Sequence, residues 1–304
     1  MNKERMMKRR RSVNVNETLL TAPSFVWLLV LFLIPTLIVV GISFRTADPY
    51  GGIGDSFSFG GFSDLASPNF PAIILRTVRL SFITTMWCLL LGMPVGYFIA
   101  RAEKKQQANL MLLIIIPFWT NFLIRVYAWK IILHPEGILK HMLTALHLAT
   151  EQTSLLYNEG AVLLVLVYTY LPFAVLPLYA AIEKFDFTLL EASRDLGAGP
   201  VRSFVTVFLP GISQGIISAI MVVFIPALGS YVIPDMVGGT GGEMLGNKIA
   251  QRVFVDRNLP RGSALSTLLV LAVVIPVLGG LILRKLRNSG KALADVPSIG
   301  EHGL

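Results

Sequence analysis

Long, nearly charge-free apolar runs constrain the fold of this chain more than any other feature. A helix needs about 20 mostly apolar residues to cross the hydrocarbon core of a bilayer. Six runs reach or approach that length, and they cover residues 18–44, 80–100, 108–123, 160–182, 203–234 and 262–283. The sequence therefore predicts an all-α, polytopic membrane protein with six transmembrane helices in a domain that spans residues 18–283.

The charge composition supports a membrane protein and argues against a nucleic-acid-binding one. Only 14% of the residues are charged, whereas a soluble domain carries about 25%. The net charge is +8, but six of the 26 lysine and arginine residues crowd the first eleven positions, shortly before the first apolar run. Such a cluster is typical of a cytoplasmic flank that contacts anionic lipid. We interpret residues 1–17 as a basic cytoplasmic arm that meets membrane lipids, with no role in binding nucleic acid.

The distribution of lysine and arginine among the connecting segments predicts the orientation in the membrane. Cytoplasmic connections carry an excess of these residues. Most of them lie in the N-terminal arm, in the 101–107 turn, in the segment between the fourth and fifth runs, and in the tail 284–304. This bias predicts that both termini are cytoplasmic, and that loops 46–75, 131–159 and 235–262 lie on the outside. Glycine and proline in the first outside loop predict an irregular structure there.

A polar segment, residues 183–210, separates the fourth and fifth apolar runs. Its charged residues include Glu191 and Arg194, and a charge at the bilayer centre costs several kcal/mol, so the segment must lie outside the bilayer. Gly197 is a natural helix stop, and Pro200 can open a second helix at its first position. The sequence therefore predicts two short helices joined at a glycine elbow, which is presented to an aqueous partner.

Motifs for catalysis and for nucleotide or metal binding are missing from the sequence. It contains no Walker lysine loop, no G-x-S-x-G and no H-E-x-x-H. Its four histidines have no companion residues at metal-ligand spacing and are interpreted as loop residues. We therefore expect a chain that is not an enzyme and binds no cofactor or metal. If it transports a solute, a partner or a gradient supplies the energy.

Polar and aromatic residues interrupt the third apolar run and leave two interpretations open. The stretch contains Trp119, Asn121, Arg125, Tyr127, Trp129 and Lys130. In one interpretation the aromatic rings anchor at the outer interface, and the two basic side chains reach lipid headgroups. In the other, the polar groups line a watery path through the bundle.

Asp235, at the end of the fifth run, also has two interpretations. It is close to Tyr231, and a carboxylate beside an aromatic ring would offer a cationic solute both charge pairing and a ring face. The alternative is a solvated residue that caps the following turn.

The spacing of residues across the elbow resembles the EAA motif of ABC importer permeases. That pattern is E-A-A, three residues, G, nine residues, I, one residue, L-P. The corresponding residues here are Glu191, Ala192, Ser193, Gly197, Val207, Leu209 and Pro210. Serine replaces the second alanine and valine replaces isoleucine, and both changes are small. The motif precedes the fifth of six runs, which is where such permeases carry it.

Other stretches resemble one subfamily, the spermidine/putrescine permeases. Residues 117–129, 171–179, 190–198 and 231–239 carry this likeness, which extends from about residue 24 to residue 284 and is closest to the first of the two permeases in such systems. The resemblance implies a type I ABC importer permease-like fold in a bacterial inner membrane, with a path for polyamines. The residues assigned to that path are Trp119, Asn121, Tyr127, Tyr231 and Asp235.

The resemblance also implies a set of partners. They are a dimeric cytoplasmic ATP-binding subunit that uses ATP and Mg, a second permease subunit, and a periplasmic or extracellular solute-binding protein. The elbow would be a coupling helix, docked in a groove of the ATP-hydrolysing subunit. The coupling residues would be Glu191, Ala192, Ser193, Gly197, Leu209 and Pro210.

Three alternatives remain at this point. One is an ABC permease for a different small solute, such as iron, thiamine, an opine or another organic cation. Another is a secondary transporter, although that class is expected to show ionisable residues in mid-span and inverted repeats. A third is a membrane scaffold that transports nothing, for which the EAA spacing would be a coincidence.

Overall fold

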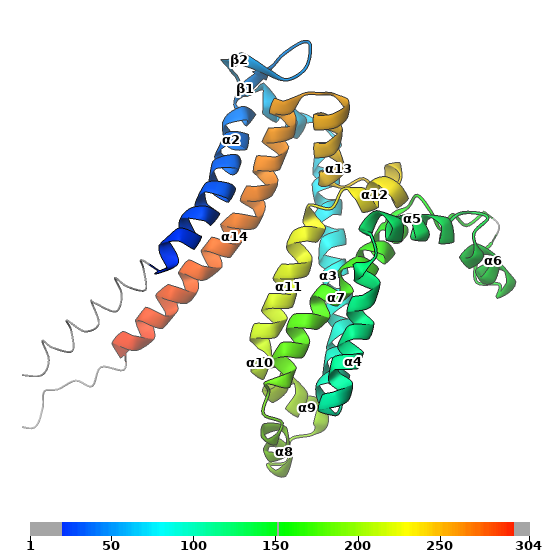
Figure 1. Cartoon of the computed structure of the whole chain (residues 1–304), viewed down its shortest axis with the longest axis vertical. Coiled ribbons are helices and arrows are strands. Elements are labelled where there is room, and N and C mark those ends of the chain that lie inside the picture. The colour runs from blue at the N-terminus through cyan, green and yellow to red at the C-terminus, as the bar shows by residue number, and fades with distance from the viewer. Residues whose placement is uncertain (1–19, 151, 295–304) are drawn as a thin grey trace, which may run out of the picture. The chain divides into compact units, whose positions relative to one another are not determined.

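The computed structural model describes residues 20–150 and 152–294, and these residues are mostly helical (Figure 1). The chain divides into two compact units, one formed by residues 1–66 and 251–304 and the other by residues 67–250. The predicted N-terminal arm, and the tail beyond residue 294, lie outside the described residues.

Four helices in the described part of the chain are long and apolar enough to cross a bilayer. They are Leu20–Ser43, Phe70–Arg101, Glu159–Glu183 and Leu259–Gly280. Two bent pairs pass the same test when each pair is taken together. Lys104–Trp119 and Phe122–Ile132 meet at 85°, and Pro200–Gly211 and Ser213–Leu228 meet at 69°. Counting each bent pair as one span gives the six spans that the apolar runs predict.

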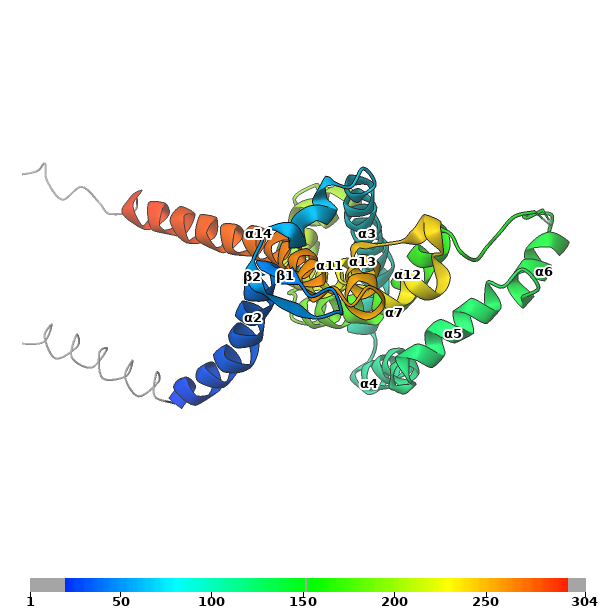
Figure 2. The ribbon, with the colours of Figure 1, turned by 90° about the horizontal axis from the view of Figure 1, so that it is seen from above.

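The first unit is built on two long helices that pack side by side (Figures 1 and 2). Its elements are η1 (Leu29–Leu33), α2 (Ile34–Ser43), β1 (Arg45–Ala47), β2 (Ile53–Phe57), η2 (Gly60–Ala66), η6 (Gln251–Val255) and α14 (Leu259–Ala294). Strands β1 and β2 pair antiparallel, and the turn between them uses Gly51 and Gly52 at φ 98° and 110°, a conformation that glycine adopts without strain. The prediction of an irregular structure is therefore wrong for this part of the 46–75 loop.

Prolines explain where the helices widen. Proline has no N–H to donate to the carbonyl four residues earlier, and its ring crowds that carbonyl. A π-helical turn, η1, directly precedes the α2 helix, which has Pro35 in its first turn. A second π turn, η4 (Phe204–Phe208), precedes Pro210 in the same way. Single π turns of this kind are the form in which the rare π-helix mostly occurs within α-helices.

The second unit has α3 (Phe70–Arg101), α7 (Glu159–Glu183) and α11 (Ser213–Leu228) at its centre, and these three helices pack against one another (Figure 2). Gly92 and Gly96 of α3 face α7 so closely that a Cβ atom on either glycine would lie 3.3 Å from an α7 atom. Small residues allow such close approach of helices in membranes.

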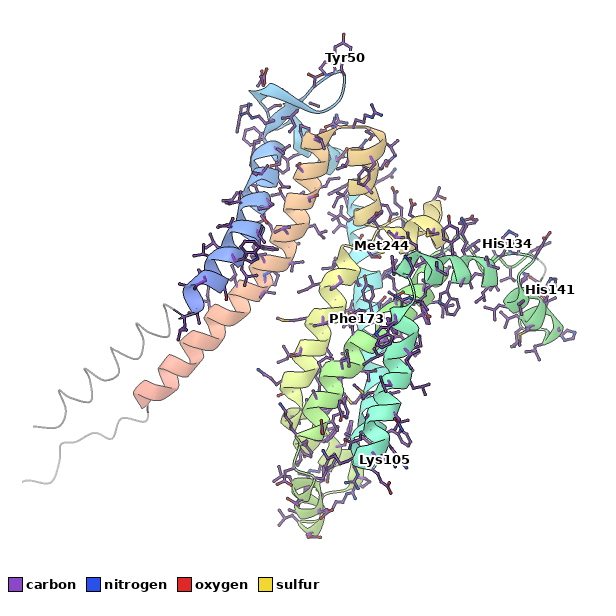
Figure 3. All side chains as sticks on the ribbon, in the orientation of Figure 1. Tyr50, Lys105, His134, His141, Phe173 and Met244 are labelled. Carbon is purple, nitrogen blue, oxygen red and sulfur yellow. The ribbon has the colours of Figure 1, made fainter. Side chains whose placement is uncertain are left out.

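Shorter elements complete the second unit. They are α4 (Lys104–Ile115), η3 (Ile116–Trp119), α5 (Phe122–Ile132), α6 (Ile138–Ala145), α8 (Thr188–Asp195), α9 (Pro200–Ser203), α10 (Leu209–Gly211), α12 (Val232–Val237), η5 (Thr240–Gly242) and α13 (Leu245–Ala250). Helices α5 and α6 reach away from the central helices, and His134 and His141 lie on this arm (Figure 3).

Two predicted span boundaries are wrong, for reasons that the structure supplies. The second span was expected to begin at residue 80, after Arg79. Helix α3 begins ten residues earlier, at Phe70, and its Arg76 and Arg79 both pair with Glu159 at the start of α7. The fifth span was expected to reach residue 234, but α11 ends at Leu228, before a break at Gly229 and the separate short helix α12.

Candidate functional site

The polar segment between the fourth and fifth runs forms two short helices joined by a glycine. We call residues 188–203 the elbow. Helix α8 ends at Asp195, and Gly197 follows with φ 83°. The N–H of Gly197 donates to the carbonyl of Arg194 over 2.8 Å, and the N–H of Ala198 donates to the carbonyl of Ser193 over 3.1 Å. This is the glycine-terminated helix end that the sequence predicts, and α9 then begins at Pro200 as expected.

The tip of the elbow exposes apolar side chains. Leu196 is 89% exposed and Val201 is 75% exposed, on a segment whose charges keep it out of the bilayer interior. Glu191 and Ala192 on α8 are also exposed, whereas Ser193 is half-buried and its hydroxyl donates to the carbonyl of Leu190. Exposed leucine and valine at a polar tip are what a docking surface for another protein presents.

The base of the elbow is fixed to the membrane helices by aromatic rings that pack edge to face. Phe208 is fully buried, and its ring centroid lies 5.2 Å from that of Phe185 and 5.8 Å from that of Tyr97 on α3. Gly211 leaves room for the Phe185 ring, which a Cβ atom there would strike. Arg101, at the end of α3, lies 4.9 Å from the centre of the Phe187 ring. These contacts pack the base of the elbow against α3 and α10.

A hydrogen-bonded carboxylate begins α8. The hydroxyl and the N–H of Thr188 both donate to one oxygen of Asp186, over 2.8 and 3.0 Å. These bonds, the hydroxyl bond first, lower the pKa of Asp186 below its ordinary value. In its charged form Asp186 therefore stabilises the turn that leads into α8.

An apolar groove of about 760 Å³ runs between α3 and the elbow. Its walls come from α3, α8, η4 and α11, and Arg194 is the one charged residue among them. Helix α8 contributes Leu190 and Arg194, one turn apart, to this groove. Leu209, near the end of the EAA pattern, also lines this groove, whereas Glu191, Ala192 and Ser193 do not.

The second candidate region is the α12–α13 loop, which we define as residues 229–248. Tyr231 and Asp235 are exposed there, and Asp235 lies in the first turn of α12. Asn247 closes the loop, since its side-chain nitrogen donates to the carbonyl of Tyr231 over 3.0 Å and its oxygen accepts from the N–H of Met244 over 3.1 Å. The backbone that carries Tyr231 is therefore held in place by a side chain sixteen residues later.

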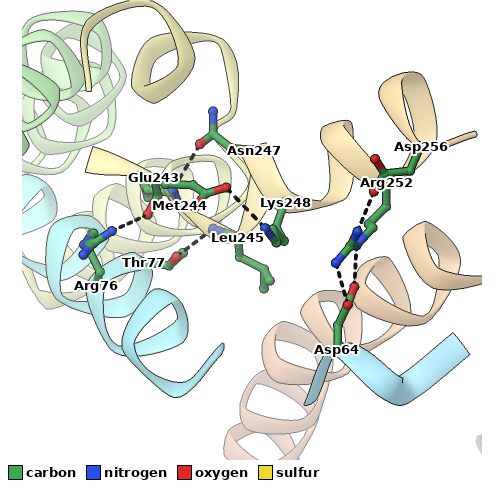
Figure 4. Close-up of polar contacts among 10 residues, drawn as sticks. All are labelled: Asp64, Arg76, Thr77, Glu243, Met244, Leu245, Asn247, Lys248, Arg252 and Asp256. Carbon is green, nitrogen blue, oxygen red and sulfur yellow. Dashed lines mark hydrogen bonds and ion pairs between the residues drawn. The ribbon is translucent and has the colours of Figure 1, made fainter. Parts of the chain in front are cut away.

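Two neighbouring residues of α3 anchor the α12–α13 loop (Figure 4). Arg76 pairs with Glu159 over 2.9 Å and donates to the carbonyl of Glu243 over 3.2 Å. The hydroxyl of Thr77 accepts from the N–H of Leu245 over 2.8 Å. Sequence reasoning missed these residues because the contacts join positions far apart in the chain. The available signal was that Arg76, Arg79 and Glu159 each stand at the beginning of a long apolar run.

The break in the third span is capped by Asn121. Its side-chain oxygen accepts from the N–H of Leu123 over 2.8 Å, which starts α5 after the 85° bend. Trp119, just before the bend, is 79% exposed, and Tyr127 on α5 is 55% exposed. Helix α5 packs against α12, so the two stretches assigned to the path come from neighbouring elements. In the described part of the chain, no hydrogen bond or ion pair joins Asn121 or Tyr127 to Asp235.

Arg125 is turned inward. Its guanidinium lies 4.5 Å from the centre of the Phe118 ring, and its Nε and Nη1 atoms are buried without a hydrogen-bond partner among the described residues. Trp129, one turn further along α5, packs edge-on against Tyr168 of α7 with centroids 5.3 Å apart. These two side chains thus pack within the second unit, whereas Trp119 and Tyr127 stay open to the surroundings. The described residues contain no group of acids, histidines and cysteine that could hold a metal ion.

The spans, the elbow and its EAA spacing define a class of membrane permease. The family model for the inner membrane component of binding-protein-dependent transport systems matches residues 92–288. The chain belongs to this family of multi-pass inner-membrane permeases, which are not enzymes. It is 38% identical to the spermidine/putrescine transport system permease protein PotB of Haemophilus influenzae, over 80% of this chain and 85% of that protein. It is 35% identical to PotB of Escherichia coli K12, over 83% of this chain and 92% of that protein.

Solved structures show the same fold. A bacterial alginate ABC transporter, in complex with its alginate pentasaccharide-bound periplasmic protein, matches with a TM-score of 0.65 at 18% identity, over 92% of this chain and 97% of that chain. The MetNI methionine ABC transporter matches with a TM-score of 0.51 at 21% identity, over 72% and 98%. The predicted all-α, type I ABC importer permease-like fold is therefore confirmed. The secondary transporter and the scaffold are excluded by the family.

Proposed function

We propose that this chain is a permease subunit of an ABC importer that forms the translocation path for polyamines, spermidine and putrescine. The observation that carries the proposal is the elbow, a glycine-terminated helix pair whose tip is exposed and whose base is locked into the membrane helices. The solute class is supported by the relatives at 35–38% identity, which are named as spermidine/putrescine permeases. Both termini face the cytoplasm in this proposal.

The proposed partners divide the work of transport. A dimeric cytoplasmic subunit binds ATP with Mg and hydrolyses it, so this chain binds neither. A second permease subunit completes the path, and a periplasmic or extracellular solute-binding protein delivers the solute. Glu191, Ala192, Ser193 and Gly197 shape the elbow surface that the ATP-hydrolysing subunit contacts. Leu209 and Pro210 belong to the helix behind it, which carries the movement into the bundle.

Substitutions in the elbow test the coupling. Gly197→Asp places a side chain and a charge where φ is 83°, and Glu191→Lys reverses a charge on the exposed face of α8. We expect each to abolish ATP-driven uptake by the reconstituted importer while the protein still reaches the membrane. Gly199→Asp is the matched control, since this glycine has φ −65° and open space around it. Normal uptake by both elbow variants would contradict the coupling role.

The solute path is proposed to include Trp119, Asn121, Tyr127, Tyr231 and Asp235. A polyamine carries several ammonium groups, and aromatic faces with a carboxylate offer them cation–π contacts and charge pairing. Asp235 is exposed and makes no ion pair with a described residue. Its carboxylate is thus open to a solute.

Asp235→Asn tests the path. We expect the KM for a diamine to rise about tenfold, the effect of roughly 1.4 kcal/mol, which is within the range for a hydrogen bond to a charged group. Asp55→Asn, on an exposed strand of the other unit, is the control. Unchanged KM and rate for Asp235→Asn would remove this residue from the path. Uptake of iron, thiamine or an opine, with no competition by putrescine or spermidine, would assign a different solute.

A further inference from the structure

We propose that a polar pocket in the first unit receives a carboxylate side chain of the solute-binding protein. The inference rests on the proposed function, because it names where that partner docks. The pocket has a volume of about 250 Å³ and lies where β1, η2 and the start of α14 meet. Its lining residues are Arg45, Thr46, Ala47, Ser58, Gly60, Gly61, Asn258, Pro260 and Arg261.

The lining is rich in hydrogen-bond donors and contains no carboxylate. Arg45 donates from one nitrogen to the carbonyl of Asp55 over 2.7 Å, which leaves its other N–H groups free. The guanidinium of Arg261 has no hydrogen bond or ion pair with any residue that the structure describes. Ser58 accepts from the N–H of Gly60 over 3.0 Å, so its hydroxyl hydrogen remains to donate. Two cations and a hydroxyl around one small cavity form a site for an anion.

Arg252, in the same unit, differs from the pocket arginines because it is paired with aspartates of this chain. Its guanidinium bonds both oxygens of Asp64 over 2.7 Å and one oxygen of Asp256 over 2.5 Å (Figure 4). These bonds, those to Asp64 first, raise the pKa of Arg252. Asp64 and Asp256 are therefore already engaged, and neither lines the pocket that contains Arg45 and Arg261.

The size and position of the pocket favour a carboxylate from a protein. A volume of 250 Å³ accommodates the end of one aspartate or glutamate side chain, and the planar fork of arginine matches a carboxylate with two parallel hydrogen bonds. The pocket lies where the hairpin that follows α2 packs against the start of α14, at the end of the apolar spans. In the proposed orientation this end faces the solute-binding protein. A cationic polyamine would be repelled from it.

The experiment measures the affinity of the solute-loaded binding protein for the complete importer in nanodiscs, by biolayer interferometry. We expect Arg45→Gln and Arg261→Gln each to weaken the Kd by about tenfold, the loss of one charge-assisted hydrogen bond. Arg45→Lys should retain more affinity than Arg45→Gln because it keeps the charge. Arg257→Gln is the matched control, since Arg257 is exposed in the same unit and does not line the pocket.

The possible outcomes separate this proposal from its rivals. An unchanged Kd in both glutamine variants would overturn it. A loss that occurs in phosphatidylglycerol nanodiscs but not in phosphatidylcholine nanodiscs would also overturn it, because the ligand of the pocket would then be an anionic lipid headgroup. Gly197→Asp should lose uptake yet keep the wild-type Kd for the binding protein, so failure of the coupling proposal is distinguishable. Arg45 is exposed, so Arg45→Gln preserves the test if Arg261→Gln fails to fold.

Discussion

The elbow precedes helix α11 and the α12–α13 loop follows it, but the two regions differ in how closely their backbones are packed. At the elbow tip, a Cβ atom added to Gly197 or Gly199 would meet no heavy atom within 4 Å. In the α12–α13 loop, a Cβ atom on Gly246 would lie 2.5 Å from the carbonyl oxygen of Ser230 and 2.9 Å from its carbonyl carbon. The tip of the elbow therefore has free space around it, whereas the α12–α13 loop packs tightly against its own backbone.

This difference indicates how the two regions divide the work. The loop is fixed from within by Asn247 and from α3 by Arg76 and Thr77, so its polar residues are held in place before any solute arrives. The elbow is fixed only at its base, by Phe208 and its neighbours. Its tip needs a partner to cover Leu196. The open region suits a movable contact, and the closed region suits a preorganised site.

The largest expected effect comes from breaking the closed region. Gly246→Ala would force a Cβ against backbone atoms, which cannot rotate away as a flexible side chain can. Overpacking of this kind costs roughly 1–3 kcal/mol. We expect a lower unfolding temperature in detergent, measured by intrinsic fluorescence, together with weaker polyamine uptake.

Gly241→Ala is the control for that experiment. Gly241 lies in the same loop, and a Cβ atom there would meet nothing within 4 Å. Its unfolding temperature should stay near that of the wild type. If Gly246→Ala and Gly241→Ala have the same stability, the loop is not closed as tightly as the structure shows.

The elbow could be predicted from the sequence because its determinants are local. A glycine that ends one helix and a proline that begins the next act within a few residues of each other. The six spans could be predicted for a similar reason, since each is a continuous apolar run. The bends were less accessible. Polar residues such as Asn121 interrupted the third apolar run, but no local feature of the sequence gives the 85° angle of the bend.

The anchors of the α12–α13 loop could not be predicted because they are long-range. Arg76 meets Glu159 across 83 positions and Glu243 across 167, and no periodicity in the sequence links them. Positive charge beside an apolar run is ordinarily interpreted as a span boundary, which is why the start of α3 was placed too late. The pocket between Arg45 and Arg261 is equally invisible in the sequence, since its walls come from opposite ends of the chain.

A smaller effect is expected when the glycine at the elbow tip is replaced by alanine, which restricts the backbone without adding charge. Gly197→Ala puts a Cβ on a residue at φ 83°, which costs about 1 kcal/mol because of backbone strain alone, since there is space around it. Gly199→Ala should cost less, because φ there is −65°. Overall stability should change little in either variant. ATP-driven uptake should fall in Gly197→Ala and remain near wild type in Gly199→Ala. Equal uptake by the two variants would show that the left-handed turn is not needed for coupling, and that the charge in Gly197→Asp acts by blocking the partner instead.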